Sequence, residues 1–170
     1  MGKLNNLLKN AYEGKDIQER VYGRFPFEIA EQCGADEVRE IILKLDELYL
    51  EKEQIEEWDG DSQDDIWSSQ KDFSALLERL TEKFAKEIAA GLKSQYPETR
   101  FWVAGAFANA PSPEVVTELA EYLLNEMPEH HRSLGQKALR ACKSKQSIFI
   151  KLFVREWITI TSCGVRHNQE

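Results

Sequence analysis

Residues 100–116 read RFWVAGAFANAPSPEVV, and the helix start and stop signals in this stretch decide the fold. Ser112 stands directly before a Pro-Glu pair at 113–114, which is the order of an N-cap, a first helical position and an acidic first turn. The same pair recurs at 97–98 and at 128–129, at intervals of 16 and 15 residues. Three helices of nearly equal length are therefore predicted, each beginning at one of these prolines.

The chain before this stretch carries two longer helical patterns. Apolar residues from Val38 to Ile55 keep one stripe at helical spacing, which predicts a helix of about twenty residues. A second stripe from Ile66 to Leu92 predicts another long helix that ends near Lys93, with a break near Ser68-Ser69. Most of the first half of the chain is thus expected to form a pair of long helices.

Shorter segments are predicted at both ends. Residues 4–12 keep helical spacing before Gly14, and residues 26–34 form another short segment between a proline and a glycine. Residues 147–161 are rich in isoleucine, phenylalanine and valine, so a strand stays open there, although two basic residues four apart favour a closing helix. The predicted fold class is all-α, with about seven helices in a single domain over residues 1–170.

The central stretch resembles HEAT-type repeats and the related leucine-rich-variant repeat. In those families an arginine, a small-residue helix packed closely on its neighbour, an Asn-x-Pro turn and a second leucine-bearing helix recur. Here the corresponding residues are Arg100, Ala104-Gly105-Ala106, Asn109-Ala110-Pro111 and Leu119. About thirty residues match well, and the next unit, 128–158, keeps the length and the opening Pro-Glu pair. The resemblance implies a HEAT-like α-solenoid, and an irregular helical bundle is the alternative.

The composition is that of one globular domain. With 170 residues, 42% of them apolar and 31% charged, the chain is neither disordered nor membrane-embedded. Its 22 lysines and arginines against 30 acids give a net charge of −8, which argues against general nucleic-acid binding. No apolar run near the N-terminus suits a signal peptide, and Cys33, Cys142 and Cys163 are too widely spaced for a disulfide framework. We therefore expect a cytoplasmic protein with buried, reduced thiols and no membrane association.

The sequence offers no motif for catalysis or metal binding. Its nine glycines stand singly, so neither a P-loop nor a dinucleotide-binding turn can be assembled. His130 and His131 are expected to face solvent, and together with His167 they lack the spacing of a zinc site. The acidic run 59–65 has its glycine second, where an EF-hand loop has it sixth. We expect no enzymatic activity, no cofactor and no metal, while pairs of carboxylates for acid–base chemistry stay open.

Charge is segregated along the chain. The acidic segment, residues 46–65, holds ten acids and one base, a net charge of −9, whereas the basic tract, residues 130–155, holds seven bases and no acid. Anions in the last turn of a helix oppose the macrodipole by about 0.3–1 kcal/mol each, so local stability alone does not select them. Tryptophans inside a charged rim are typical of binding hot spots. The candidate partner-binding residues are Glu53, Glu56, Glu57, Trp58, Asp59, Asp61, Asp64, Asp65 and Trp67.

A small, acidic, all-helical chain with a concentrated anionic patch resembles the immunity proteins of bacterial contact-dependent inhibition and other polymorphic toxin systems, several of which use HEAT-like folds. The resemblance implies that the partner is a cognate toxin domain. A basic nuclease fits best, because the acids would occupy its nucleic-acid cleft in place of phosphates. No direct contact with nucleic acid is expected, and the oligomeric state stays open.

Other interpretations remain. The basic tract can neutralise the acidic segment within the fold, and both tryptophans can belong to the core. A HEAT-repeat protein-binding scaffold without a toxin partner would bind through residues 101–110 and later helices. A nucleic-acid groove along the basic tract would need exposed rings, but Phe149, Phe153 and Trp157 keep the spacing of a core-facing stripe.

Overall fold

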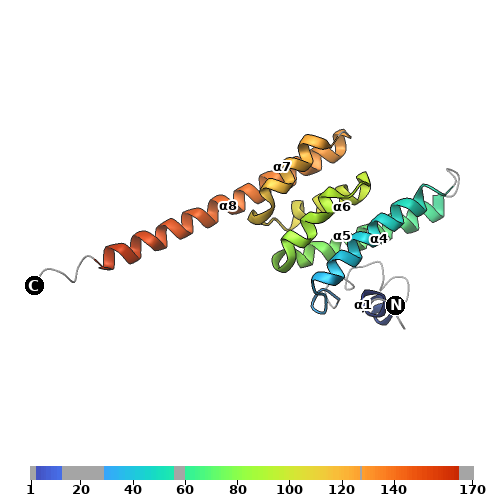
Figure 1. Ribbon diagram of the computed structural model, residues 1–170, viewed down its shortest axis with the longest axis horizontal. Helices are drawn as coiled ribbons and strands as arrows, with labels where there is room; N and C mark the ends of the chain where they lie inside the picture. Colours follow the sequence, from blue (N-terminus) through green and yellow to red (C-terminus); the bar gives the residue numbers. More distant parts are fainter. Residues whose placement is uncertain (1–2, 13–28, 56–59, 127, 165–170) are drawn as a thin grey trace, which may run out of the picture.

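All the regular structure in the described residues is helical, which confirms the all-α prediction (Figure 1). There are six α-helices and two 3-10 helices in this part of the chain, against about seven helices predicted. None of them combines the length and the apolar character that a membrane span needs. The computed structural model describes residues 3–12, 29–55, 60–126 and 128–164, with the side chains of residues 3–9, 29–55, 60–126 and 128–147.

The first two described helices confirm their predictions. Helix α1 (Lys3–Tyr12) contacts α4 (Ala35–Lys52), whose buried residues follow the predicted apolar stripe. At the start of α4 the Gly34 N–H donates a hydrogen bond of 2.6 Å to Glu37 Oε2, and Lys3 Nζ of α1 lies 3.3 Å from the same oxygen. This hydrogen bond and the Lys3 charge hold the pKa of the Glu37 carboxyl below its ordinary value. Of the segment predicted at 26–34, only the part from residue 29 lies within the described residues.

The second long helix is present, but its break lies elsewhere than predicted. Helix α5 (Gly60–Ala89) is interrupted at Phe84, whose φ of −134° and ψ of 36° are non-helical, and it continues into η1 (Ala90–Lys93). The break predicted near Ser68-Ser69 is wrong, because Ser69 Oγ donates to the Asp65 carbonyl at 3.0 Å within a continuous helix. A hydroxyl that bonds back to its own helix does not need to end it.

Helix α6 (Pro97–Asn109) occupies the centre of the fold. It contacts α4, α5, η1 and α8, and its residues Val103, Ala104, Ala106 and Phe107 are fully buried. Small side chains allow this many neighbours to approach closely. A Cβ on Gly91 of η1 would lie only 2.7 Å from Val103 Cγ2, so the absence of a side chain there is part of the same close packing.

The predicted starts of the last three helices are confirmed, but their equal length is wrong. Ser112 Oγ accepts a hydrogen bond from the Glu114 N–H at 3.4 Å and so caps η2 (Pro113–Val115), which leads into α7 (Val116–Asn125). Helix α8 (Glu129–Gly164) then runs for 36 residues, and Figure 1 shows it continuing beyond the body of the molecule. Residues 147–161 are thus helical and belong to α8. The physical reason is that residues 136–163 contain no glycine or proline that would end the helix.

Helices α5 and α6 run in the same direction. Gln70 Nε2 of α5 donates to Glu98 Oε2 of α6 at 2.9 Å, and Asn109 Nδ2 of α6 donates to Glu78 Oε2 of α5 at 3.1 Å. Later residues of α5 therefore contact later residues of α6, which is the pattern of parallel helices. Between these two bonds Ser74 Oγ of α5 donates to the Trp102 carbonyl of α6 at 2.9 Å, so polar bonds and apolar packing both join the two helices.

Helix α8 lies along the other side of α6, also in the same direction. The rings of Phe101 and His131 are 4.8 Å apart, and further along a Cβ on Gly105 would lie 3.6 Å from Leu134 Cδ2. Helices α5, α6 and α8 thus form one parallel row, with η1 between α5 and α6 in sequence and with η2 and α7 between α6 and α8. That these pairs form a HEAT-like solenoid stays a prediction.

Candidate partner-binding surface

One half-buried carboxylate, that of Glu98, joins three helices. Lys52 Nζ at the end of α4 lies 2.6 Å from Glu98 Oε1, near the start of α6. The other oxygen of Glu98 accepts the hydrogen bond from Gln70 of α5, a side chain that is almost fully buried. This network joins the end of α4 and the start of α6 to Gln70 in the first half of α5, towards one end of the molecule, the right-hand end in Figure 1.

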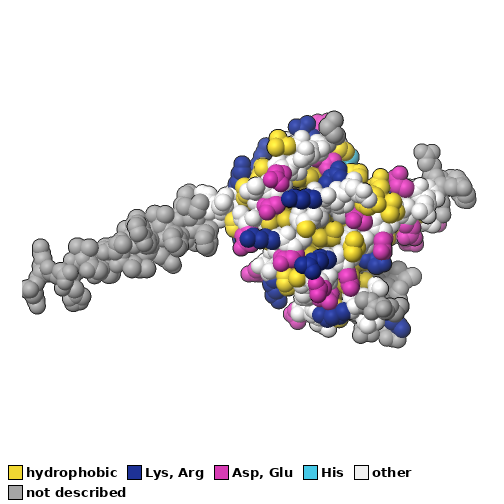
Figure 2. All heavy atoms as spheres, viewed as in Figure 1, with side chains coloured by type: hydrophobic (Ala, Val, Ile, Leu, Met, Phe, Trp, Pro, Cys, Tyr) yellow, Lys and Arg dark blue, Asp and Glu magenta, His cyan; other side chains and the backbone are white. Residues whose placement is uncertain are grey.

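Exposed acids gather at this end, and acidic side chains are visible there in Figure 2. Glu53 follows α4 directly, whereas Asp61, Asp64 and Asp65 lie in the first two turns of α5. All four side chains are exposed, and none of their carboxylates forms an ion pair with another described residue. The other acidic candidates and one tryptophan lie outside the described residues: Glu56, Glu57, Trp58 and Asp59.

The helix ends differ in detail from the predictions. The sequence places Glu53 in the last turn of α4, but the helix ends at Lys52 and Glu53 is its C-cap. Gly60 begins α5, so Asp61 lies in the first turn of a helix, where the macrodipole favours an anion by about 0.3–1 kcal/mol. The helix itself therefore gives Asp61 a structural reason to be acidic, beside any role in binding.

Two members of the acidic segment have internal roles. Asp46 Oδ1 accepts hydrogen bonds from Ser94 Oγ at 2.7 Å and from Thr99 Oγ1 at 2.6 Å, and it thereby holds the start of α6. Glu47 pairs with Lys44 on the same helix. These two acids bond to other residues of the fold. The unpaired negative charge of the acidic segment therefore comes from residues that follow them.

Trp67 is a surface residue. Its side chain is 50% exposed, so the alternative that it belongs to the core is wrong. One edge of the indole packs against Trp102 of α6, with 6.3 Å between ring centroids and 63° between planes. Lys71, one turn further along α5, places its Nζ 5.2 Å from the centroid of the Trp67 ring. An exposed indole that already attracts a cation lies one turn from the exposed acids of α5.

Trp67 begins a row of rings that the sequence analysis missed. We call Trp67, Trp102, Phe101, His130 and His131 the aromatic row. Trp102 contacts Phe101 at 5.4 Å, and Phe101 contacts the two histidines at 6.0 and 4.8 Å between centroids. The row crosses α5, α6 and the start of α8. Nothing in the sequence pairs these positions, because they meet only when the three helices pack in parallel.

The two histidines differ in environment. His130 is exposed as predicted, but His131 is only 5% exposed, so the prediction that it faces solvent is wrong. His131 packs on Phe101, and its Nδ1 lies 3.5 Å from Glu126 Oε1 without a hydrogen bond. Burial, with a smaller contribution from the His130 charge, lowers the pKa of His131, while Glu126 acts in the opposite direction.

Arg100 neutralises Glu126 beside this histidine. Its Nε lies 2.7 Å from Glu126 Oε2, and the Glu126 side chain is 1% exposed. The Tyr122 hydroxyl donates to the His131 carbonyl at 3.3 Å, and burial raises the pKa of this phenol above its ordinary value. The arginine that marks the repeat resemblance thus has a clear structural role, since it joins α6 to the α7–α8 connection.

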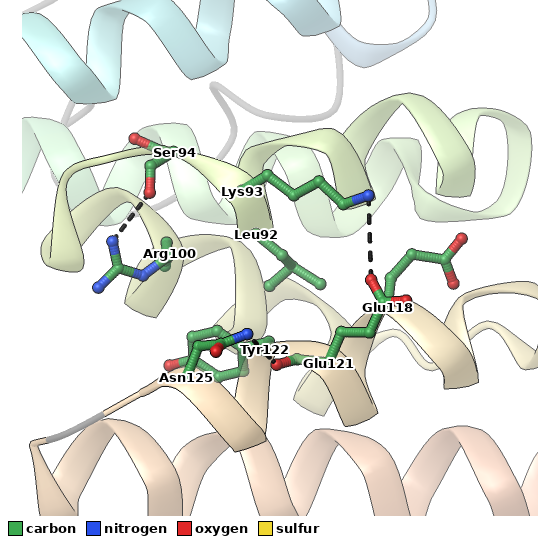
Figure 3. A pocket seen from close by; sticks show the side chains of 8 residues that line it. All are labelled: Leu92, Lys93, Ser94, Arg100, Glu118, Glu121, Tyr122 and Asn125. Atoms are coloured by element: carbon green, nitrogen blue, oxygen red, sulfur yellow. Dashed lines mark hydrogen bonds and ion pairs between the residues drawn. The ribbon is translucent and has the colours of Figure 1, made fainter.

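A pocket of about 430 Å³ opens between η1, the start of α6 and α7 (Figure 3). On one side Arg100 Nη1 donates to the Ser94 carbonyl at 2.8 Å. On the other side Lys93 Nζ lies 3.9 Å from Glu121 Oε2, and both of these side chains are exposed. Both basic and acidic side chains line the pocket. Its two basic side chains, Arg100 and Lys93, are already bonded to groups of the chain itself.

Nothing in the described residues gathers three side chains of the types that bind metals. The thiols of Cys33 and Cys142 are free and buried, as predicted, whereas Cys163 lies outside the described side chains. Burial raises the pKa of Cys33 to about 11 and also raises that of Cys142, so both are thiols rather than thiolates at neutral pH.

The basic tract does not neutralise the acidic segment among the described side chains. Its first five bases are exposed on α8, and none of them forms an ion pair with another described residue. The last two bases, Lys151 and Arg155, and the rings of Phe149, Phe153 and Trp157 lie outside the described side chains. The five exposed bases are Arg132, Lys137, Arg140, Lys143 and Lys145.

No protein-family model, curated protein or solved structure matches this chain. The resemblances to HEAT repeats and to immunity proteins therefore stay expectations.

Proposed function

We propose that this chain is a protein-binding module that neutralises a basic partner by covering its cationic cleft with an acidic surface. The partner that fits best is a toxin domain with nuclease activity, as the likeness to immunity proteins implies. The binding surface comprises the exposed acids Glu53, Asp61, Asp64 and Asp65 with Trp67, and it includes the adjoining residues Glu56, Glu57, Trp58 and Asp59. A HEAT-like solenoid is the proposed framework.

One observation carries this proposal. Four exposed carboxylates at the α4–α5 end have no ion-pair partner among the described residues, although the same chain carries exposed bases on α8. Their negative potential is therefore directed to solvent. Exposed charges within about 8–10 Å of each other act together at physiological salt, because this is the Debye length.

The mechanism is electrostatic steering followed by apolar contact. An acidic surface accelerates the encounter with a basic partner, up to about 10⁸–10⁹ M⁻¹s⁻¹ at low salt. Carboxylates can then take the positions of phosphates in a nuclease cleft and exclude its substrate. Trp67, which is half exposed, supplies the ring whose burial slows dissociation.

The experiment is native purification from the source at low salt, with a search for a co-purifying protein of high pI. A triple variant neutralises the three exposed acids in the first two turns of α5, and a control triple variant makes the same charge change at exposed acids far from this end. The partner should be retained by the wild type and by the control and lost by the test variant, and its nuclease activity should be inhibited only where it is retained. Retention by all three proteins would overturn the proposal. The test changes are Asp61→Asn, Asp64→Asn and Asp65→Asn, and the control changes are Glu31→Gln, Glu82→Gln and Glu114→Gln.

The alternative, a HEAT-repeat scaffold without a toxin partner, has less support. It uses exposed side chains of residues 101–110 and of later helices, but within 101–110 Asn109 alone is exposed and the other side chains are buried or half-buried. A scaffold that binds through apolar contacts would also show weak dependence on salt.

A further inference from the structure

We propose that the aromatic row is a binding site for arginine side chains, and that an arginine-bearing segment of the basic partner lies along it. This inference rests on the proposed function and extends it, because it names the chemical group that is recognised and adds Trp102, Phe101 and His130 to the binding surface.

The rings of the aromatic row form a continuous series. From Trp67 the rings follow each other through Trp102 and Phe101 to His130, with centroid separations of 6.3, 5.4 and 6.0 Å. Trp67 and His130 are exposed at its two ends, and the two rings between them are half-buried. Half-buried rings are held in place by the core behind them, so they present a rigid surface to a partner at low entropic cost.

A cation of the chain itself already lies at one end of the aromatic row. Lys71 Nζ lies 5.2 Å from the Trp67 centroid, within the range of a cation–π contact. Lys71 is exposed and forms no ion pair with another described residue. It can therefore leave the ring without disturbing the fold, and a partner's cation can take its place.

The charges around Trp67 also complement an arginine side chain. Asp64, Trp67 and Lys71 are three and four residues apart on α5, so they share one face of the helix. A guanidinium on Trp67 therefore has exposed carboxylates within one helical turn. Arginine suits such a site better than lysine, because its planar and weakly hydrated group stacks on rings while its N–H groups bond to carboxylates.

The test uses a short synthetic peptide that repeats Gly-Arg, with Gly-Lys and Gly-citrulline peptides as controls. Binding is followed on the indole N–H signals of Trp67 and Trp102, which are assigned with Trp67→Phe and Trp102→Phe variants. The Gly-Arg peptide should shift both signals and bind more tightly than Gly-Lys, and Gly-citrulline should not bind. Equal affinity for Gly-Arg and Gly-Lys, or shifts confined to other residues, would overturn the inference.

Substitutions at Trp67 test the role of the ring itself. Trp67→Phe keeps a weaker π surface and Trp67→Leu keeps only apolar area, so affinity should fall stepwise, by about two- to fivefold in total. Affinity that is unchanged in Trp67→Leu would show that acids alone attract the peptide.

Lys71 provides a test that a merely structural role would not satisfy. Lys71→Gln frees the ring, so the Gly-Arg peptide should bind about two- to fivefold more tightly than to wild type. Lys83→Gln is the matched control, since Lys83 is also exposed on α5 but lies three turns away. Equal effects of the two variants would mean that net charge and not the ring decides affinity.

The two proposals fail in different ways. If neutralising Asp61, Asp64 and Asp65 abolishes peptide binding while the tryptophan and Lys71 variants behave as wild type, the aromatic row is not the site and the acidic surface still is. If the acid variants bind as wild type does, the proposed function fails first.

Discussion

At the scale of single residues, environment decides the role of a side chain more than its type does. Arg100 and Lys93 line the same pocket (Figure 3), but Arg100 pairs with the buried carboxylate of Glu126 and Lys93 pairs with an exposed carboxylate. Removing one partner of a buried ion pair leaves an uncompensated charge, whereas exposed pairs contribute little. The two residues therefore offer a matched comparison.

Arg100→Met should lower the free energy of unfolding by about 3 kcal/mol, because Glu126 then stays buried without its guanidinium. Lys93→Met should change it by less than about 1 kcal/mol. Urea denaturation measures both values. Similar losses in the two variants would contradict the structural role given to Arg100.

His131 predicts a pH dependence of stability. Its folded-state pKa lies below the ordinary value of 6.5, mainly because of burial, so the unfolded chain takes up the proton at higher pH. The folded state favours neutral His131, so the contribution of this residue to folding stability is fully present above about pH 6.5 and is lost as the pH falls through the lower folded pKa. The charged groups that face His131 are Glu126, Arg100 and His130.

Thermal unfolding from about pH 7.5 to about pH 5.5 should show this loss in the wild type and a smaller slope in His131→Gln. His130→Gln is the control, because His130 is exposed and its variant should keep most of the slope. An unchanged slope in His131→Gln would show that other groups cause the acid sensitivity.

At the scale of helices, the sequence predicts where elements begin better than where they end. The Pro-Glu pairs and the Ser112 cap are local signals, and all three starts are confirmed. The kink at Phe84 has no such signal, and the length of α8 follows from the absence of stop residues over a long distance. Gly135 illustrates what only packing shows, since its sequence context gives no reason for a glycine.

Gly135→Ala should destabilise the protein by about 1–3 kcal/mol, because a Cβ there would lie 2.6 Å from Tyr122 Cε1 and 2.8 Å from Leu123 Cδ2. Gly105→Ala is the control in α6, where the nearest atoms would be 3.6 and 3.7 Å away. It should stabilise by up to about 1 kcal/mol through helix propensity. Thermal or urea unfolding measures the change in the free energy of unfolding for each variant. We expect this change to have opposite signs in the two variants.

At the scale of the whole molecule, charge segregation in the sequence becomes charge segregation on the surface. The exposure of Asp61, Asp64 and Asp65 could be expected from their polarity, and the structure adds that bases of α8 do not pair with them among the described residues. The aromatic row could not be expected, because Trp67, Trp102 and His130 are far apart in sequence. A binding surface of this kind depends on tertiary structure.

The central claim is that this acidic surface meets a basic macromolecule. The most direct measurement is the association rate constant with the co-purified basic partner as a function of ionic strength, for the wild type and for the variant with Asp61→Asn, Asp64→Asn and Asp65→Asn. The wild-type rate should fall steeply with added salt, and the variant should associate more slowly at low salt with a flatter dependence. Equal rates and equal salt dependence in the two proteins would contradict the account.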